Sequence, residues 1–111
     1  MKRYALTLDL QDNPDLIAEY ERYHQQVPSA IIDSIRQAGI TDMYIYRLGT
    51  RLFMFMQTTD EFRFEQKAAM DAVNPEVQKW EELMWKFQKP LPEAKPGEKW
   101  LLMKEVFTLN P

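Results

Sequence analysis

Histidine occurs once in this chain of 111 residues, at position 24, and a tyrosine lies four residues before it, at position 20. The imidazole of histidine has an unperturbed pKa of about 6.5, so it can give and take protons near neutral pH. Residues four apart share one face of a helix, so Tyr20 could bind a ligand or orient the imidazole. His24 is therefore a candidate for acid–base catalysis, although most single histidines are surface or helix-end residues.

The stretch VQKWEELMW, residues 77 to 85, holds further candidates. Trp80 could be a core residue or a stacking platform for a sugar, because the C–H faces of sugars pack on indole rings. Trp85 lies off the main apolar stripe, so it could cover a pocket or an interface. Glu81 fits a solvated helix face together with Glu76 and Glu82. The pattern alone leaves these roles open.

Glu105 is unusual for its expected place in a strand. Alternation puts it on the same face as Leu101, Met103 and Phe107. A carboxylate on an apolar face must be paired, protonated or functional. The alternative is that the other face, which carries Lys104, points inward.

Composition excludes several kinds of chemistry. The chain has no cysteine, which rules out disulfides, thiolate nucleophiles and cysteine-ligated metals. A single histidine excludes a histidine cluster, and no metal site is predicted. The net charge is −3 and no basic stripe is present, so we expect no nucleic-acid partner. Phosphate-loop, dinucleotide, nucleophile-elbow and zinc motifs are also absent.

No targeting or membrane segment is apparent. The N-terminal residues MKRYALTLDL lack the apolar run of about 7–15 residues that a signal peptide needs. No apolar stretch approaches the roughly 20 residues that cross a bilayer. We therefore expect a cytoplasmic protein without a membrane partner.

Hydrophobic periodicity supplies the elements that would position these residues. Strands are predicted at residues 3–10, 43–48, 51–58 and 100–109. Helices are predicted from about residue 15 to Gly39 with an interruption at Pro28, then at 59–72 and 75–88. The first begins after a cap at Asp12 or Asn13, the second after Thr59 or Asp60, and Asn74-Pro75 separates the last two. Residues 89–100 form a proline-rich loop.

This order of elements is βαββαβ, which predicts one α+β domain over residues 1–111 with a ferredoxin-like, four-stranded antiparallel sheet and helices on one face. The strand at 51–58 is apolar on both faces, since Phe53 and Phe55 oppose Leu52, Met54 and Met56. Such a strand should be covered on both sides. A second subunit packed sheet to sheet would cover it, so a homodimer is expected.

Four motifs together resemble the L-rhamnose mutarotase family: EYERYH, IYRLGTRLFMFM, VQKWEELM and EVFTL. The stretches GITDMYIYRLGTRLFM and WKFQKPLPEAKPGEKW are more similar to the branch associated with L-fucose than to the rhamnose branch. The resemblance covers almost the whole chain. It implies a dimeric α+β barrel of the ferredoxin-like class, a monosaccharide substrate, a homodimer and no cofactor.

The resemblance also implies an activity and a site. The activity is interconversion of the α and β anomers of a 6-deoxy-hexose, with L-fucose favoured over L-rhamnose, through ring opening and closure by acid–base catalysis. His24 takes the place of the catalytic proton donor. The substrate contacts it implies are Tyr20, Met43, Trp80 and Glu81.

Several positions depart from the rhamnose branch. Glu81 replaces the second tryptophan of a pair, and Met43 replaces a tyrosine, although Tyr44 is adjacent. Val27-Pro28 stands where a Trp-Pro pair is common. These departures bear on which sugar is bound.

Other questions remain open at the level of sequence. The group that complements His24 could be Glu81, Glu105, Tyr20 or a bound water. Two alternative functions also fit the fold class: a non-catalytic sugar-binding or regulatory dimer, and a dimeric α+β-barrel oxygenase or haem-degrading protein. A second histidine or a haem-ligand pattern would favour the oxygenase, and neither is present.

Overall fold

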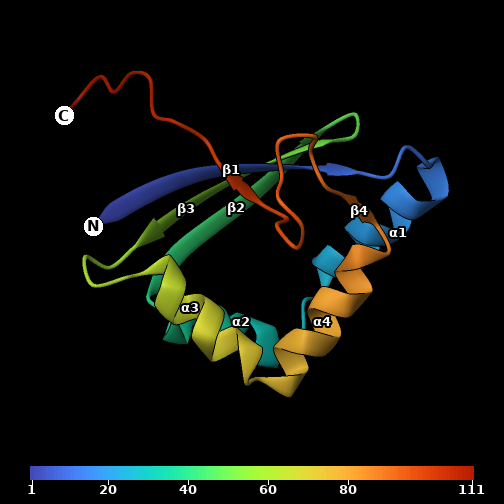
Figure 1. The fold of residues 1–111 in the computed structure, drawn as a ribbon, viewed down its shortest axis with the longest axis horizontal. Helices are drawn as coiled ribbons and strands as arrows, with labels where there is room; N and C mark the ends of the chain where they lie inside the picture. Colours follow the sequence, from blue (N-terminus) through green and yellow to red (C-terminus); the bar gives the residue numbers. More distant parts are fainter.

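A computed structural model describes residues 1–111 as one antiparallel sheet with helices against one of its faces (Figure 1). The elements are β1 (Lys2–Leu10), α1 (Pro14–Gln25), α2 (Ser29–Gln37), β2 (Ile40–Leu48), β3 (Arg51–Thr58), α3 (Phe64–Ala72), α4 (Pro75–Trp85), β4 (Gln88–Lys89) and β5 (Leu101–Leu102). The strand order is β2-β3-β1-β4, with β5 also pairing with β1. This order confirms the predicted ferredoxin-like α+β fold, although the sheet has five strands and not the four predicted.

Two asparagine–proline pairs begin the helices that carry the candidate site. The side chain of Asn13 accepts hydrogen bonds from the backbone N–H groups of Asp15 and Leu16, and Pro14 opens α1. Asn74 caps α4 in the same way. Proline suits the first helical turn because that position has no intrahelical acceptor for an N–H. The predicted boundaries at these two pairs are confirmed.

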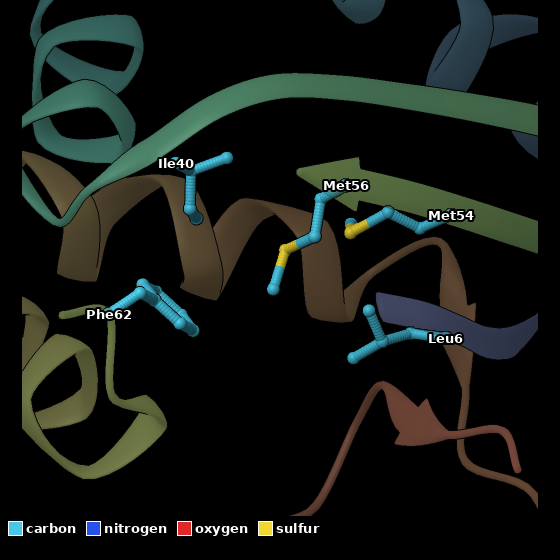
Figure 2. Packing of buried hydrophobic residues seen from close by; sticks show 5 residues of the cluster. All are labelled: Leu6, Ile40, Met54, Met56 and Phe62. Atoms are coloured by element: carbon cyan, nitrogen blue, oxygen red, sulfur yellow. The ribbon is translucent and has the colours of Figure 1, made fainter. Parts of the chain in front are cut away.

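Alternation along the central strands separates the two faces of the sheet. Leu52, Met54 and Met56 of β3 face the helices and are buried, as are Leu6 and Leu8 of β1. Figure 2 shows one half of the core, where Leu6, Ile40, Met54, Met56 and Phe62 point into the same space. The other half contains Leu10, Tyr20, Leu52, Met84 and Phe87. This second cluster lies between β1, β3, α1 and α4.

The opposite face of the sheet carries aromatic side chains that no helix of this chain covers (Figure 1). We call Tyr44, Tyr46, Phe53 and Phe55 the outer aromatic face. Tyr44 pairs across the strands with Phe55, and Tyr46 with Phe53, each with ring centroids 6.3 Å apart. Tyr46 is 62% exposed. The prediction that β3 is apolar on both faces is therefore correct.

The third helix begins later than predicted, at Phe64 instead of residue 59 or 60. Thr59 follows directly after β3, and its backbone N–H donates to the carbonyl of Gly39, just before β2. This bond extends the pairing of the two strands by one residue, so Thr59 does not begin a helix. Asp60 is not a cap, because its carboxylate pairs with the N-terminal amine at 2.7 Å. Phe62 is buried in the core cluster, and this anchoring keeps residues 59–63 out of the helix. The prediction of a cap at Thr59 or Asp60 was wrong.

Both predicted elements at the C-terminal end are shorter than expected. The helix predicted to reach residue 88 ends at Trp85, because Gln88 pairs with Leu10 at the edge of β1. The strand predicted at 100–109 covers only Leu101–Leu102.

After the backbone bond from Met103 to Ala5, the chain leaves the sheet (Figure 1). Side-chain bonds from Arg3 to Glu105 and Thr108 replace the backbone ladder there. Alternation predicted a strand, but a strand also needs a partner along its length. The side chains of Val106, Phe107 and Leu109 are left exposed.

The structure contains no helix long and apolar enough to span a membrane.

Candidate active site

His24 lies near the end of α1, and the hydrogen bond of its Nδ1 fixes which nitrogen can exchange protons. Nδ1 is 2.9 Å from the backbone carbonyl oxygen of Tyr20, one turn earlier. A carbonyl can only accept, so Nδ1 carries the proton and Nε2 of the neutral ring has a free lone pair. Burial lowers the pKa of His24, while the bond to the Tyr20 carbonyl acts in the opposite direction. The imidazole is therefore neutral at pH 7, with Nε2 as a base.

Two aromatic rings hold the imidazole in place. The Tyr20 and His24 rings have centroids 4.2 Å apart and are inclined by 37°. The indole of Trp80, from α4, lies 5.5 Å from the imidazole in an edge-to-face arrangement. The structure thus brings together three of the predicted site residues, from two helices far apart in sequence.

Tyr20 is buried in the core cluster with Leu10, Met84 and Phe87. Burial raises the pKa of its hydroxyl to about 12, a hydrogen bond from the Gln88 side chain opposes this, and the Glu81 carboxylate adds to it. Tyr20 is therefore protonated at every physiological pH. The negative charge of Glu81 therefore acts on the Tyr20 hydroxyl and disfavours its ionisation.

Gln88 adds a buried polar group beside Tyr20. Its side chain is buried, and its Oε1 has no hydrogen-bond partner. A buried acceptor without a partner is costly, and a water or a ligand hydroxyl would satisfy it. Gln88 thus places a second buried polar side chain beside Tyr20.

Glu81 is fixed by a lysine that the sequence did not indicate. Lys99 donates to Glu81 Oε2 at 2.7 Å and to the Glu81 backbone carbonyl at 3.0 Å. The ammonium of Lys99 also lies 4.4 Å from the centre of the Trp85 ring. Trp85, predicted to cover a pocket or an interface, thus packs against the lysine that holds Glu81.

Two of the candidates lie elsewhere in the chain. Glu105 is exposed and pairs with Arg3 at 2.8 Å, near the start of β1, whereas Tyr20 packs on Leu10 at its end. Met43 packs against the other core cluster, with Ile40 and its neighbours. Neither is brought to His24 within one chain.

Two features of the surface do not add to the site. A hollow of about 310 Å³ beside α1 is lined by Glu19, Arg22, Tyr23 and Gln26, and it does not include His24. No group of three or more histidine, aspartate or glutamate side chains is arranged to hold a metal ion.

Sequence reasoning missed Lys99 and Gln88. The sequence predicts a proline-rich loop around Lys99 and a helix end at Gln88. Nothing in either stretch indicates a functional role for these two residues. Their roles depend on contacts between segments that only the fold brings together.

The sequence is similar to known proteins over almost its whole length. A sequence model described as L-rhamnose mutarotase matches residues 3–109. An L-fucose mutarotase from Xanthomonas campestris pv. campestris is 45% identical over 99% of this chain and 90% of its own length. An L-rhamnose mutarotase from Jannaschia sp. is 27% identical over 86% of this chain and 88% of its own.

A solved structure shows the same fold. The crystal structure of an L-rhamnose mutarotase from Formosa agariphila superposes with a TM-score of 0.72 at 20% identity, covering 98% of this chain and 99% of that one. At this identity the likeness concerns the fold alone.

Proposed function

This chain belongs to the L-rhamnose mutarotase family, whose members are isomerases acting at the anomeric carbon, and on that premise we propose that it interconverts the α and β anomers of L-fucose in preference to L-rhamnose. The observation that carries the chemistry is the imidazole of His24, whose Nδ1 is bound to the Tyr20 carbonyl and whose Nε2 is available. The identity of 45% to an L-fucose mutarotase, against 27% to an L-rhamnose mutarotase, supports the choice of sugar.

The reaction opens the sugar ring and closes it on the other face. Nε2 of His24 accepts the proton of the anomeric hydroxyl, and the bond between the anomeric carbon and the ring oxygen breaks. A water molecule gives a proton to the ring oxygen, and the imidazolium then returns its proton to the water. Rotation about the bond between C1 and C2 presents the other face of the aldehyde, and the same transfers in reverse close the ring. No proton is gained or lost.

The position and pKa of His24 suit this role. A base whose pKa is close to the working pH is efficient in both directions, and positioned acid–base catalysis contributes roughly 10²- to 10⁴-fold. Burial lowers the pKa of the imidazole, so the base form predominates at neutral pH. Spontaneous mutarotation already occurs in water, so an enhancement of this size is enough for function.

Of the four groups considered as partners of His24, water is the one we assign. Lys99 donates to the Glu81 carboxylate at 2.7 Å, so we assign Glu81 as a hydrogen-bond acceptor and not as the proton donor. Glu105 pairs with Arg3 elsewhere. The pKa of about 12 keeps the Tyr20 hydroxyl protonated, and Tyr20 orients His24 through its ring and its backbone carbonyl.

We assign the remaining contacts to sugar binding. The Trp80 indole, at 5.5 Å from the imidazole, offers a face for the C–H side of the sugar ring. The Glu81 carboxylate offers an acceptor for a hydroxyl. The contact to Met43 implied by the family resemblance is retained in the proposal, although Met43 packs with the other core cluster in a single chain.

The proposal includes a homodimer formed through the outer aromatic face. Phe53, Phe55 and the tyrosines of β2 form a continuous apolar surface over the two neighbouring strands. An uncovered patch of this kind marks an interaction surface. A second copy of the chain presents the same patch, and a two-fold axis would bring the two sheets face to face.

Saturation-transfer proton NMR tests the activity directly. The anomeric protons of L-fucose and L-rhamnose are irradiated in turn, with and without the protein. We expect exchange above the background rate for both sugars, and faster exchange for L-fucose. Binding of either sugar without enhanced exchange would favour a non-catalytic sugar-binding dimer instead.

A further inference from the structure

Lys99 is the most buried lysine that forms an ion pair in this chain, and its hydrogen bonds and its cation–π contact are all to residues of α4. Its side chain is 9% exposed, whereas that of Glu81 is 46% exposed. A lysine that is buried must be paired, because taking its charge out of water is costly. The bond to Glu81 meets that need and leaves the carboxylate accessible from solvent.

The contacts of Lys99 leave Glu81 little freedom. The ammonium holds Oε2 at 2.7 Å and the backbone carbonyl of the same residue at 3.0 Å. The Trp85 ring, 4.4 Å from Nζ, provides a further favourable contact for the cation. Because Lys99 uses Oε2, Oε1 remains as an acceptor of fixed direction.

The fixed carboxylate is part of the site that contains His24. Glu81 follows Trp80, whose indole contacts the imidazole. Its charge also acts on the hydroxyl of Tyr20, whose ring packs against the imidazole. A sugar seated against His24 is therefore within the field of Glu81.

We propose that Lys99 is a positioning residue which fixes the Glu81 carboxylate as the acceptor for one ring hydroxyl, and that this pair selects L-fucose over L-rhamnose. The inference rests on the proposed function. The two sugars differ in the orientation of the hydroxyls at C2 and C4. The reacting carbon, C1, is the same in both. An acceptor of fixed direction forms a good hydrogen bond with a hydroxyl in one orientation and a poor one with a hydroxyl in the other. A mobile carboxylate would turn to accept from either.

The test compares exchange of the two sugars in Lys99 variants. Lys99→Met keeps most of the aliphatic side chain and removes the charge. We expect L-fucose exchange to fall about 10- to 100-fold, the range for a lost hydrogen bond to a charged group, and L-rhamnose exchange to change by less than about 3-fold. The loss should fall mainly on KM if Glu81 binds the sugar equally in the ground and transition states. Lys99→Arg, which can still bond Glu81, should recover most of the preference.

Two further variants separate positioning from a general loss of structure. Lys79→Met is the matched control. Lys79 lies on α4, the helix that carries Glu81, but it is exposed and is 3.9 Å from its only carboxylate partner, Glu76. This variant should leave both rates unchanged. Glu81→Gln added to Lys99→Met should cause little additional loss, because the two residues act as one unit.

The outcomes distinguish this inference from the proposed function. A wild-type protein that exchanges neither sugar overturns both. A wild-type protein that is active, with a Lys99→Met variant in which the ratio of L-fucose to L-rhamnose rates is unchanged, overturns the inference alone. A variant that loses both rates equally and unfolds at a lower temperature would show that Lys99 is structural.

Discussion

The imidazole of His24 stacks on the ring of Tyr20 with centroids 4.2 Å apart, and its Nδ1 donates to the Tyr20 carbonyl at 2.9 Å. One residue thus supports the histidine by its side chain and by its backbone. The spacing of one helical turn makes both contacts possible. The result is an imidazole of fixed tautomer with Nε2 as its reactive atom.

The pH dependence of exchange should follow the neutral form of His24. Burial lowers the pKa of His24 below its usual 6.5, so the base form predominates above pH 6.5 and is lost as the pH falls through the folded-state pKa. We expect the enzymatic rate, after subtraction of background, to reach a plateau as the pH rises above neutral and to be half lost only below pH 6.5. A rate that is half lost above pH 6.5 would contradict the assignment.

The same titration can be observed without the reaction. His24 is the only histidine, so proton NMR shows a single imidazole to follow with pH. The unfolded chain binds the proton more readily than the folded one, so stability should also decline as the pH falls below 6.5. Loss of activity and titration of the ring should share one midpoint.

Tyr20→Phe should separate the positioning of His24 from proton transfer by the tyrosine. The variant keeps the ring stack and the backbone carbonyl, so we expect less than a tenfold loss of exchange. It leaves the buried Gln88 side chain without its hydroxyl partner, which should lower the free energy of unfolding by about 1–3 kcal/mol.

Chemical denaturation measures that change, with Tyr23→Phe as the control. Tyr23 is partly exposed, so its variant should change stability by less than about 0.5 kcal/mol. If Tyr20→Phe lost as much activity as removal of His24, the tyrosine and not water would be the proton donor.

A charge on the outer aromatic face should dissociate the proposed homodimer. Phe53→Glu places a carboxylate in the middle of the patch, where Tyr46 faces it from the neighbouring strand. Light scattering at micromolar concentration should give a dimer mass for the wild type and a monomer mass for this variant. Val73→Glu, which adds the same charge at an exposed position after α3, should remain dimeric. A wild-type monomer would refute the dimer.

Local signals in the sequence predicted the parts of the fold that depend on local physics. The caps at Asn13 and Asn74 are set by residues next to them, and the two apolar faces of β3 follow from its own side chains. The proximity of Tyr20 and His24 follows from helical spacing. These features need no knowledge of distant segments.

The errors arose where a distant contact decides the outcome. Residues 103–109 alternate like a strand but have no partner strand in this chain, and Glu105 therefore pairs with Arg3. Phe62 is anchored in the core and delays the start of α3. Lys99 reaches Glu81 from a loop 18 residues further along, which no local pattern indicates.

The most direct test of the central claim is anomer exchange of L-fucose by His24→Ala, measured by saturation-transfer NMR with and without added imidazole. The account predicts that the variant falls to the background rate and that free imidazole restores part of the enhancement by occupying the space of the lost ring. Imidazole added to the wild type controls for catalysis in solution. Exchange by His24→Ala at the wild-type rate would show that His24 does not carry the proton, and the mechanism would be wrong.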